Sequence, residues 1–195
     1  MKKRLLAVLM AAVTVFAVGC GGSKSEKENE TTTAAPVVEV KDALEIFTNT
    51  WNLYADDEKF PVCGGDFENS VMDAPGNMGL SDAENVDYML GFPQDSIEMI
   101  DDCASLMHMM NANTFTAGVY HVADAENTET LASDIKDNIL ARQWMCGFPE
   151  KLIIVQISDD YLVSAFGHGE PIDLFKSKLS EAYPEAEFLF EEPIE

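Results

Sequence analysis

Basic residues are scarce in this chain: 12 Lys and Arg stand against 35 Asp and Glu, for a formal net charge of −23 at pH 7. A surface that binds nucleic acid needs clustered basic side chains to meet the phosphates, so this charge balance excludes that class of protein. It also argues against a domain that lies flat on an anionic membrane. A bound cation, a basic partner or simple solubility is compatible with it.

The short motifs of common enzyme classes are missing as well. The sequence has no Gly-x-Ser-x-Gly nucleophile elbow, no phosphate-binding loop and no zinc-protease motif. It also lacks an EF-hand calcium loop, so its acidic clusters are interpreted as helix starts and solvated faces. The sequence therefore assigns no catalytic residue, no metal ligand and no cofactor.

Cysteines are few, and none of them stands in a Cys-x-x-Cys pair. Apart from Cys20, the chain has Cys63, Cys103 and Cys146. Three thiols allow at most one internal disulfide and leave one thiol free. Spacing alone does not decide between such a disulfide and three buried, reduced side chains.

The first residues have the layout of an export signal. Lys2, Lys3 and Arg4 precede an uncharged, mainly apolar run over residues 5–18. A basic start, a short apolar stretch and small residues at a cleavage site are typical of secretory signals. The run is too short to span a bilayer, because a spanning helix needs about 20 residues. We therefore expect residues 1–19 to be a signal peptide.

The end of this signal resembles the lipobox of bacterial lipoproteins, in which a cysteine is acylated and the chain is cut just before it. The resemblance rests on Gly19, Cys20 and Gly21. It implies a lipid on Cys20 and a protein held on the outer face of the cell membrane, because two or more acyl chains anchor stably. Residues 20–36 hold no large apolar side chain and predict a disordered tether.

Residues 37–195 are long enough for one acidic domain with its own core. Capping boxes at residues 42–45 and 81–84 predict two helices, the first reaching about Tyr54 and the second stopping at Gly91. A third helix is expected from Asp95 or Ser96. Its apolar stripe comprises Met99, Ile100, Cys103, Leu106, Met107 and Met110.

The second half of the chain alternates strands and helices. Strands are predicted at residues 115–122, 152–157, 161–166 and 188–190, and helices open at Asn127 and near Pro171. This β-α-β-β-α-β order is that of the ferredoxin-like split unit. The expected fold class is therefore α+β: N-terminal helices followed by a βαββαβ unit with an antiparallel sheet and helices on one face.

A polar, glycine-rich stretch over residues 55–80 predicts a long ordered loop. Loops of this length without secondary structure are uncommon unless they are functional or disordered, and the apolar residues here disfavour full disorder. We expect the loop to form a binding surface with the segment around Phe92 and the loop at 167–169. The candidate binding residues are Phe60, Asp66, Phe92 and His168.

Two other kinds of chemistry stay open at this stage. Cys146 with His168 or His121 could form a nucleophile–base pair, although their spacing does not bring them together. The expected Met-rich helix, with Cys103, Met107 and Met110 on its stripe and His108 on the opposite side, holds soft ligands that suit Cu(I). Methionines in a helical stripe more often fill a core.

Several word-like stretches, at residues 104–118, 142–149 and 163–167, together with the lipobox, resemble small lipoproteins of unknown function from Gram-positive, gut-type anaerobic bacteria. That resemblance implies an extracytoplasmic location and supplies no catalytic residues. The sequence thus favours a membrane-tethered binding or interaction module. Its partner would be a small molecule or a protein of the cell envelope.

Overall fold

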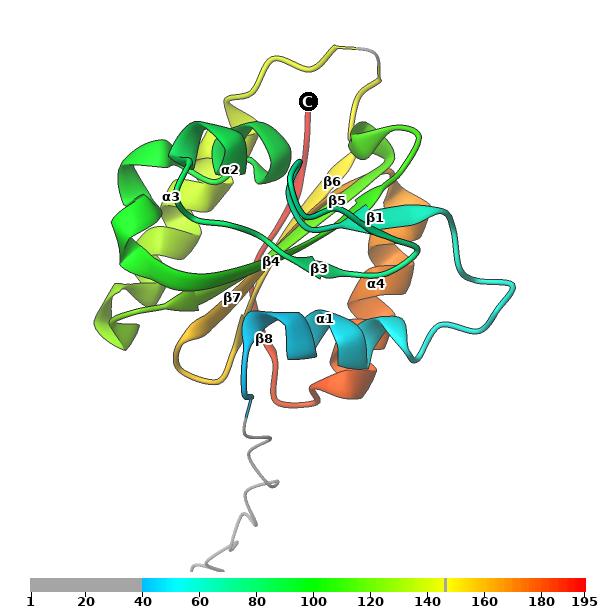
Figure 1. Cartoon of the computed structure of the whole chain (residues 1–195), viewed down its shortest axis with the longest axis horizontal. Coiled ribbons are helices and arrows are strands. Elements are labelled where there is room, and N and C mark those ends of the chain that lie inside the picture. Colours follow the sequence, from blue (N-terminus) through cyan, green and yellow to red (C-terminus); the bar gives the residue numbers. More distant parts are fainter. Residues whose placement is uncertain (1–39, 146) are drawn as a thin grey trace, which may run out of the picture. The chain divides into compact units, whose positions relative to one another are not determined.

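A computed structural model describes residues 40–145 and 147–195, so the expected signal peptide, Cys20 and almost all of the tether lie outside the described residues. The described part has three layers, with one eight-stranded antiparallel sheet between two pairs of helices (Figure 1). The helices are α1 (Ala43–Trp51), α2 (Ala83–Leu90), α3 (Thr128–Leu140) and α4 (Gly169–Ala182), with short 3-10 turns at Gln94–Met99, Ala112–Thr114 and Ala125–Asn127. The strands are β1 (Val62–Gly64), β2 (Val71–Met72), β3 (Gly76–Asn77), β4 (Ile100–His108), β5 (Phe115–Val122), β6 (Lys151–Ile157), β7 (Tyr161–Gly167) and β8 (Glu187–Pro193).

The strands follow the order β2-β1-β4-β5-β7-β6-β8, and β3 pairs with β4 beside this path. The long central strands are buried on both faces, and their side chains alternate between two cores. In β4, for example, Ala104 and Leu106 face α1 and α4, whereas Cys103 and Met107 face α2 and α3. Within the described ranges, no helix is long and apolar enough to cross a membrane.

Side-chain caps define where the first two helices begin. Asp42 accepts a hydrogen bond from the Glu45 backbone N–H at 2.8 Å, which confirms the predicted start of α1. The second helix starts one residue later than predicted: Asp82, in place of Ser81, caps it by accepting from the Asn85 N–H at 3.1 Å. A capping oxygen satisfies one of the N–H groups that a helix leaves unpaired at its first turn.

The βαββαβ order predicted for the second half is confirmed by β5, α3, β6, β7, α4 and β8. The finer ferredoxin-like arrangement is not confirmed, and the expectation of helices on one face is wrong. β8 lies beside β6, and β4 takes the place beside β5. Both crossovers therefore move the same way across the sheet but start from oppositely directed strands. Right-handed crossovers then place α3 and α4 on opposite faces.

The helix predicted from residue 95 to about residue 110 is also wrong. Gln94–Met99 forms a 3-10 turn, and Ile100–His108 is β4, a central strand. Residues 103–107 of β4 are buried on both faces, so this part of the strand shows no alternation of apolar and polar residues. Helical spacing could be fitted to such a run, but its pairing with β1, β3 and β5 determines the strand.

The stretch at residues 55–80 is ordered, as expected, and contains the three short strands β1, β2 and β3. Two glycines let its backbone segments touch: a Cβ added at Gly64 would lie 2.2 Å from the Gly76 nitrogen. The buried Ser105 hydroxyl donates to the Gly65 carbonyl at 2.8 Å and fixes the stretch to β4. This segment therefore forms a fixed wall beside α2.

Candidate functional site

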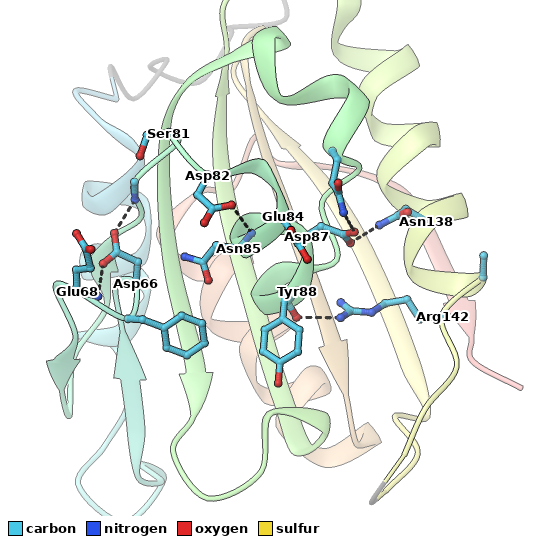
Figure 2. Close-up of a pocket in the computed structure, with 14 residues that line it drawn as sticks. Asp66, Glu68, Ser81, Asp82, Glu84, Asn85, Asp87, Tyr88, Asn138 and Arg142 are labelled. Carbon is cyan, nitrogen blue, oxygen red and sulfur yellow. Dashed lines mark hydrogen bonds between the residues drawn. The ribbon is translucent and has the colours of Figure 1, made fainter.

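An open pocket of about 890 Å³ lies between the ordered segment before α2, helix α2 itself and the end of α3. Figure 2 shows Asp66 and Glu68 at one end, Asn138 and Arg142 at the other, and the residues of α2 between them. Arg142 is the one basic residue in the lining, against five carboxylates. These are Asp66, Glu68, Asp82, Glu84 and Asp87.

Helix α2 provides one wall of the pocket. Glu84, Asp87 and Tyr88 are three and four residues apart, so their side chains share one face of the helix. The opposite face of α2 buries Val86, Met89 and Leu90 against the sheet. The polar face is thus held toward the pocket by the packing of the apolar face.

Asp66 is the predicted binding residue that reaches this pocket, and its carboxylate is already used by the protein. It accepts from the Glu68 N–H at 2.9 Å, the Asn69 N–H at 2.8 Å and the Gly79 N–H at 3.0 Å. Hydrogen bonds from these backbone groups lower the pKa of the Asp66 carboxyl. Its carboxylate therefore joins residues 68–69 to Gly79 and holds the pocket wall together.

Asp87 is similarly committed. Its two oxygens accept from Gln94 Nε2 at 2.9 Å and from Asn138 Nδ2 at 3.0 Å. Asn138 also donates to the Gly91 carbonyl at 2.9 Å, which ties α3 to the end of α2. Within the part of the chain that the structure describes, the carboxylates of Glu68 and Glu84 make no hydrogen bond or ion pair. These two acids are available to a ligand.

Arg142 closes the other end of the pocket. Its Nη2 donates to the Tyr88 carbonyl at 2.9 Å, one of the carbonyls that α2 leaves unpaired in its last turn. The guanidinium lies over the Trp144 ring, 5.4 Å from its centroid. Burial lowers the pKa of Arg142, although the group stays charged at neutral pH. Arg142 therefore acts as a helix cap and leaves the carboxylates in excess.

Two aromatic rings stand exposed at the pocket. Phe67 and Tyr88 are each 70 % exposed, and their ring centroids lie 6.3 Å apart. An aromatic face attracts a cation through its quadrupole, and more strongly as water is removed. Glu84 precedes Tyr88 by one helical turn, so a carboxylate and an aromatic pair lie on the same wall. This combination suits an organic ammonium or guanidinium group.

The other predicted binding residues do not gather here. Phe60 is half-buried and packs against the core under α1 and α4, 5.3 Å from the Phe115 ring and stacked on His108. Phe92 is fully buried on the opposite face of the sheet, 4.8 Å from the Tyr120 ring. Neither side chain lines the pocket, and the sheet separates the two.

His168 lies at the N-terminal end of α4, where its backbone N–H donates to the Thr114 carbonyl at 2.9 Å. It does not line the pocket beside α2. Cys146, the proposed nucleophile of the alternative enzyme hypothesis, lies outside the described residues. Cys63 and Cys103 are free thiols, and burial raises the pKa of both.

The helix on which the copper hypothesis depended is a strand, β4. The His108 ring takes part in hydrogen bonds to the backbone. Its Nδ1 accepts from the backbone N–H groups of Met110 at 3.2 Å and Asn111 at 3.3 Å. The Nδ1 lone pair is thus occupied by these two backbone donors. Within residues 40–145 and 147–195, no three His, Cys, Asp or Glu side chains are grouped to hold a metal ion.

His121, near the end of β5, forms a separate charged group with two aspartates. Its Nδ1 is hydrogen-bonded to Asp101, and its Nε2 lies 3.4 Å from Asp160 Oδ2. Burial alone would lower the pKa of His121, but the hydrogen bond and charge of Asp101 and the charge of Asp160 outweigh burial and raise it. The imidazole, when protonated, thus links β4, β5 and the β6–β7 turn.

Sequence reasoning missed Phe67, Glu84 and Tyr88 as a group. The signal was present: an acid and a tyrosine one turn apart on the polar face of a short amphipathic helix. The acids around α2 were interpreted as a helix start, which is correct for the cap Asp82 and for Glu84 in the first turn, but that interpretation did not consider a ligand. Comparison with protein-family models, with curated proteins and with solved structures gave no match.

Proposed function

We propose that this chain is an extracytoplasmic lipoprotein, anchored through Cys20, whose folded part binds a cationic ligand in the pocket beside α2. The supporting observation is the exposed Phe67–Tyr88 ring pair beside the carboxylates of Glu68 and Glu84, which are unpaired within residues 40–145 and 147–195. A bound ligand would cover the exposed apolar surface of the two rings. The carboxylates and the ring faces both favour a positively charged group. The formal charge of −23 would also draw a cation toward the pocket.

Binding can be tested with spermidine, a flexible organic polyamine, by titration calorimetry on the whole chain in phosphatidylcholine nanodiscs. Glu84→Gln and Tyr88→Ala should each weaken binding by about three- to fivefold, since an exposed ion pair or cation–π contact contributes up to about 1 kcal/mol. Tyr88→Phe keeps the ring and should bind like the wild type.

Glu181→Gln is the matched control, because it removes the same charge from an exposed position on α4, on the other face of the sheet. Equal losses for Glu84→Gln and Glu181→Gln would show only general charge attraction and would contradict a defined site. No heat of binding at millimolar spermidine would overturn the proposal for this cation.

The anchoring part of the proposal needs a separate measurement. Metabolic labelling with an alkyne fatty acid should mark the wild-type chain in its native envelope, and Cys20→Ser should abolish the label. Labelling that persists in Cys20→Ser would refute the assignment of the lipid to this residue.

A further inference from the structure

A second hollow, of about 350 Å³, adjoins the cationic-ligand pocket. Phe67, Tyr88 and Arg142 line both hollows, so the two lie side by side. Its size is that of a small-molecule site or of one or two large side chains. We call it the methionine groove, after the residues that line it.

Five methionines line this groove, and they come from separate parts of the chain: Met89, Met107, Met109, Met110 and Met145. Methionine is unbranched and polarizable, so a surface of this composition adapts to apolar side chains of different shape. The Trp144 ring, which lies 5.2 Å from Phe166, forms a firmer part of the lining. The methionines therefore give the groove a deformable apolar part, whereas Asn113 and Gln143 add polar groups to its lining.

Much of this apolar surface is open to water. Met110 is 77 % exposed and Met145 is 79 % exposed. Of the nine exposed large apolar side chains in the described residues, five line the groove. Scattered exposed apolar residues need no explanation, but a contiguous group beside a pocket marks an interaction surface.

We propose that one peptide segment of a basic partner protein occupies both hollows, with a Lys or Arg side chain in the acidic pocket and a neighbouring large apolar side chain in the methionine groove. This inference rests on the proposed cation-binding function and specifies its ligand. Phe67 and Tyr88 stand where the hollows meet, with 6.3 Å between their ring centroids. Residues close together in one segment can therefore reach both.

Charge decides between a basic partner and a second copy of this chain. Two copies would each bring a formal charge of −23 to the contact and place acids against acids. A basic segment instead pairs with Glu68 and Glu84, whose carboxylates are free of other partners among the described residues. Acidic charge beside a methionine-rich apolar groove is complementary to a segment that is both basic and apolar.

The test uses two labelled peptides of equal length and equal positive charge. One has Leu beside its Lys residues, and the other has Ser in place of each Leu. Fluorescence anisotropy is measured with the whole chain in phosphatidylcholine nanodiscs, and empty nanodiscs provide the background. The Leu peptide should bind at least tenfold more tightly, because burial of one large apolar side chain is worth about tenfold in affinity.

Variants in the acidic pocket and in the methionine groove separate the contribution of charge from that of apolar contact. The double variant Met109→Ser, Met110→Ser should weaken the Leu peptide by about tenfold and leave the Ser peptide unchanged. Glu84→Gln should weaken both peptides alike. Val71→Ser, at a 40 % exposed apolar position that lines neither hollow, is the matched control and should alter neither peptide.

Equal affinity for the two peptides, or a Leu peptide insensitive to the methionine double variant, would overturn this inference. If spermidine and the Ser peptide still bind and respond to Glu84→Gln, the cation-binding function stands and only the apolar half fails. If neither peptide nor spermidine binds the wild type, both proposals fail together.

Discussion

Gly91, which ends α2, provides the sharpest test of how the pocket wall is held. Its φ is +71°, in the left-handed region, and an added Cβ would lie 2.7 Å from Ile139 Cγ1 of α3. Gly91→Ala therefore combines two costs. A left-handed alanine costs about 1–2 kcal/mol, and overpacking against a core side chain costs about 1–3 kcal/mol. The free energy of unfolding should fall by about 2–5 kcal/mol.

Urea denaturation followed by circular dichroism measures this loss directly. With a slope of about 2 kcal/mol per molar urea, the midpoint should drop by about 1–2.5 M. Gly169→Ala is the matched control: Gly169 begins α4, and its added Cβ would meet the flexible end of Glu150 at 3.3 Å. It should change the free energy of unfolding by less than about 1 kcal/mol. Equal midpoints for the two variants would refute the reasoning about α2 and α3.

Three further predictions concern other contacts. Asn138→Ala removes two donors that join α3 to α2 and should lower the free energy of unfolding by about 2–3 kcal/mol in urea, with an unchanged midpoint contradicting it. The raised pKa of His121 predicts stabilisation that is complete below the ordinary pKa of about 6.5 and is lost as pH rises through the raised value. Urea midpoints across neutral pH should show this decline in the wild type, and a decline of the same size in His121→Gln would exclude His121 as its cause. Cys63 should react slowly with a thiol reagent and be protected by the bound Leu peptide, whereas fully buried Cys103 should react only on unfolding, as mass spectrometry would show. Equal labelling of the two thiols in the folded protein would contradict the burial difference.

The elements that could be predicted from sequence are those with a local signal. Asp42 marks the start of α1, and Pro171 lies in the first turn of α4, as expected. Strand β5 was bounded correctly, because its residues have high strand propensity. Each of these features acts within a few residues of itself, so no tertiary information was needed.

The errors arose where distant parts of the chain decide the structure. Strand β4 has few β-branched residues and apolar side chains on both faces, so only its partner strands distinguish it from a buried helix. The position of β8 beside β6 determines that α4 lies on the opposite face from α3. The sequence of residues 187–193 holds no signal for this pairing. Strands of two or three residues, such as β2, are too short to show a period.

The candidate site was predicted only in part, for a related reason. Asp66 was chosen because it lies in a long polar loop, and it does line the pocket. Phe92 was chosen beside a helix stop, yet the stop itself turns its ring into the core. Tyr88 and Phe67 come from different elements, and only the folded chain brings their rings together.

The proposed binding site and most of the sheet come from different stretches of this chain. Most of the pocket lining comes from residues 66–94, with a smaller contribution from residues 138–142, while the long strands of the sheet are β4 and the four strands of the βαββαβ unit. Substitutions at residues 67, 68, 84 and 88 would thus alter ligand preference without opening a cavity in either core. Selection could diversify the ligand while the stability of the scaffold is conserved, and a library built on these four positions would sample new specificities at low cost in folding.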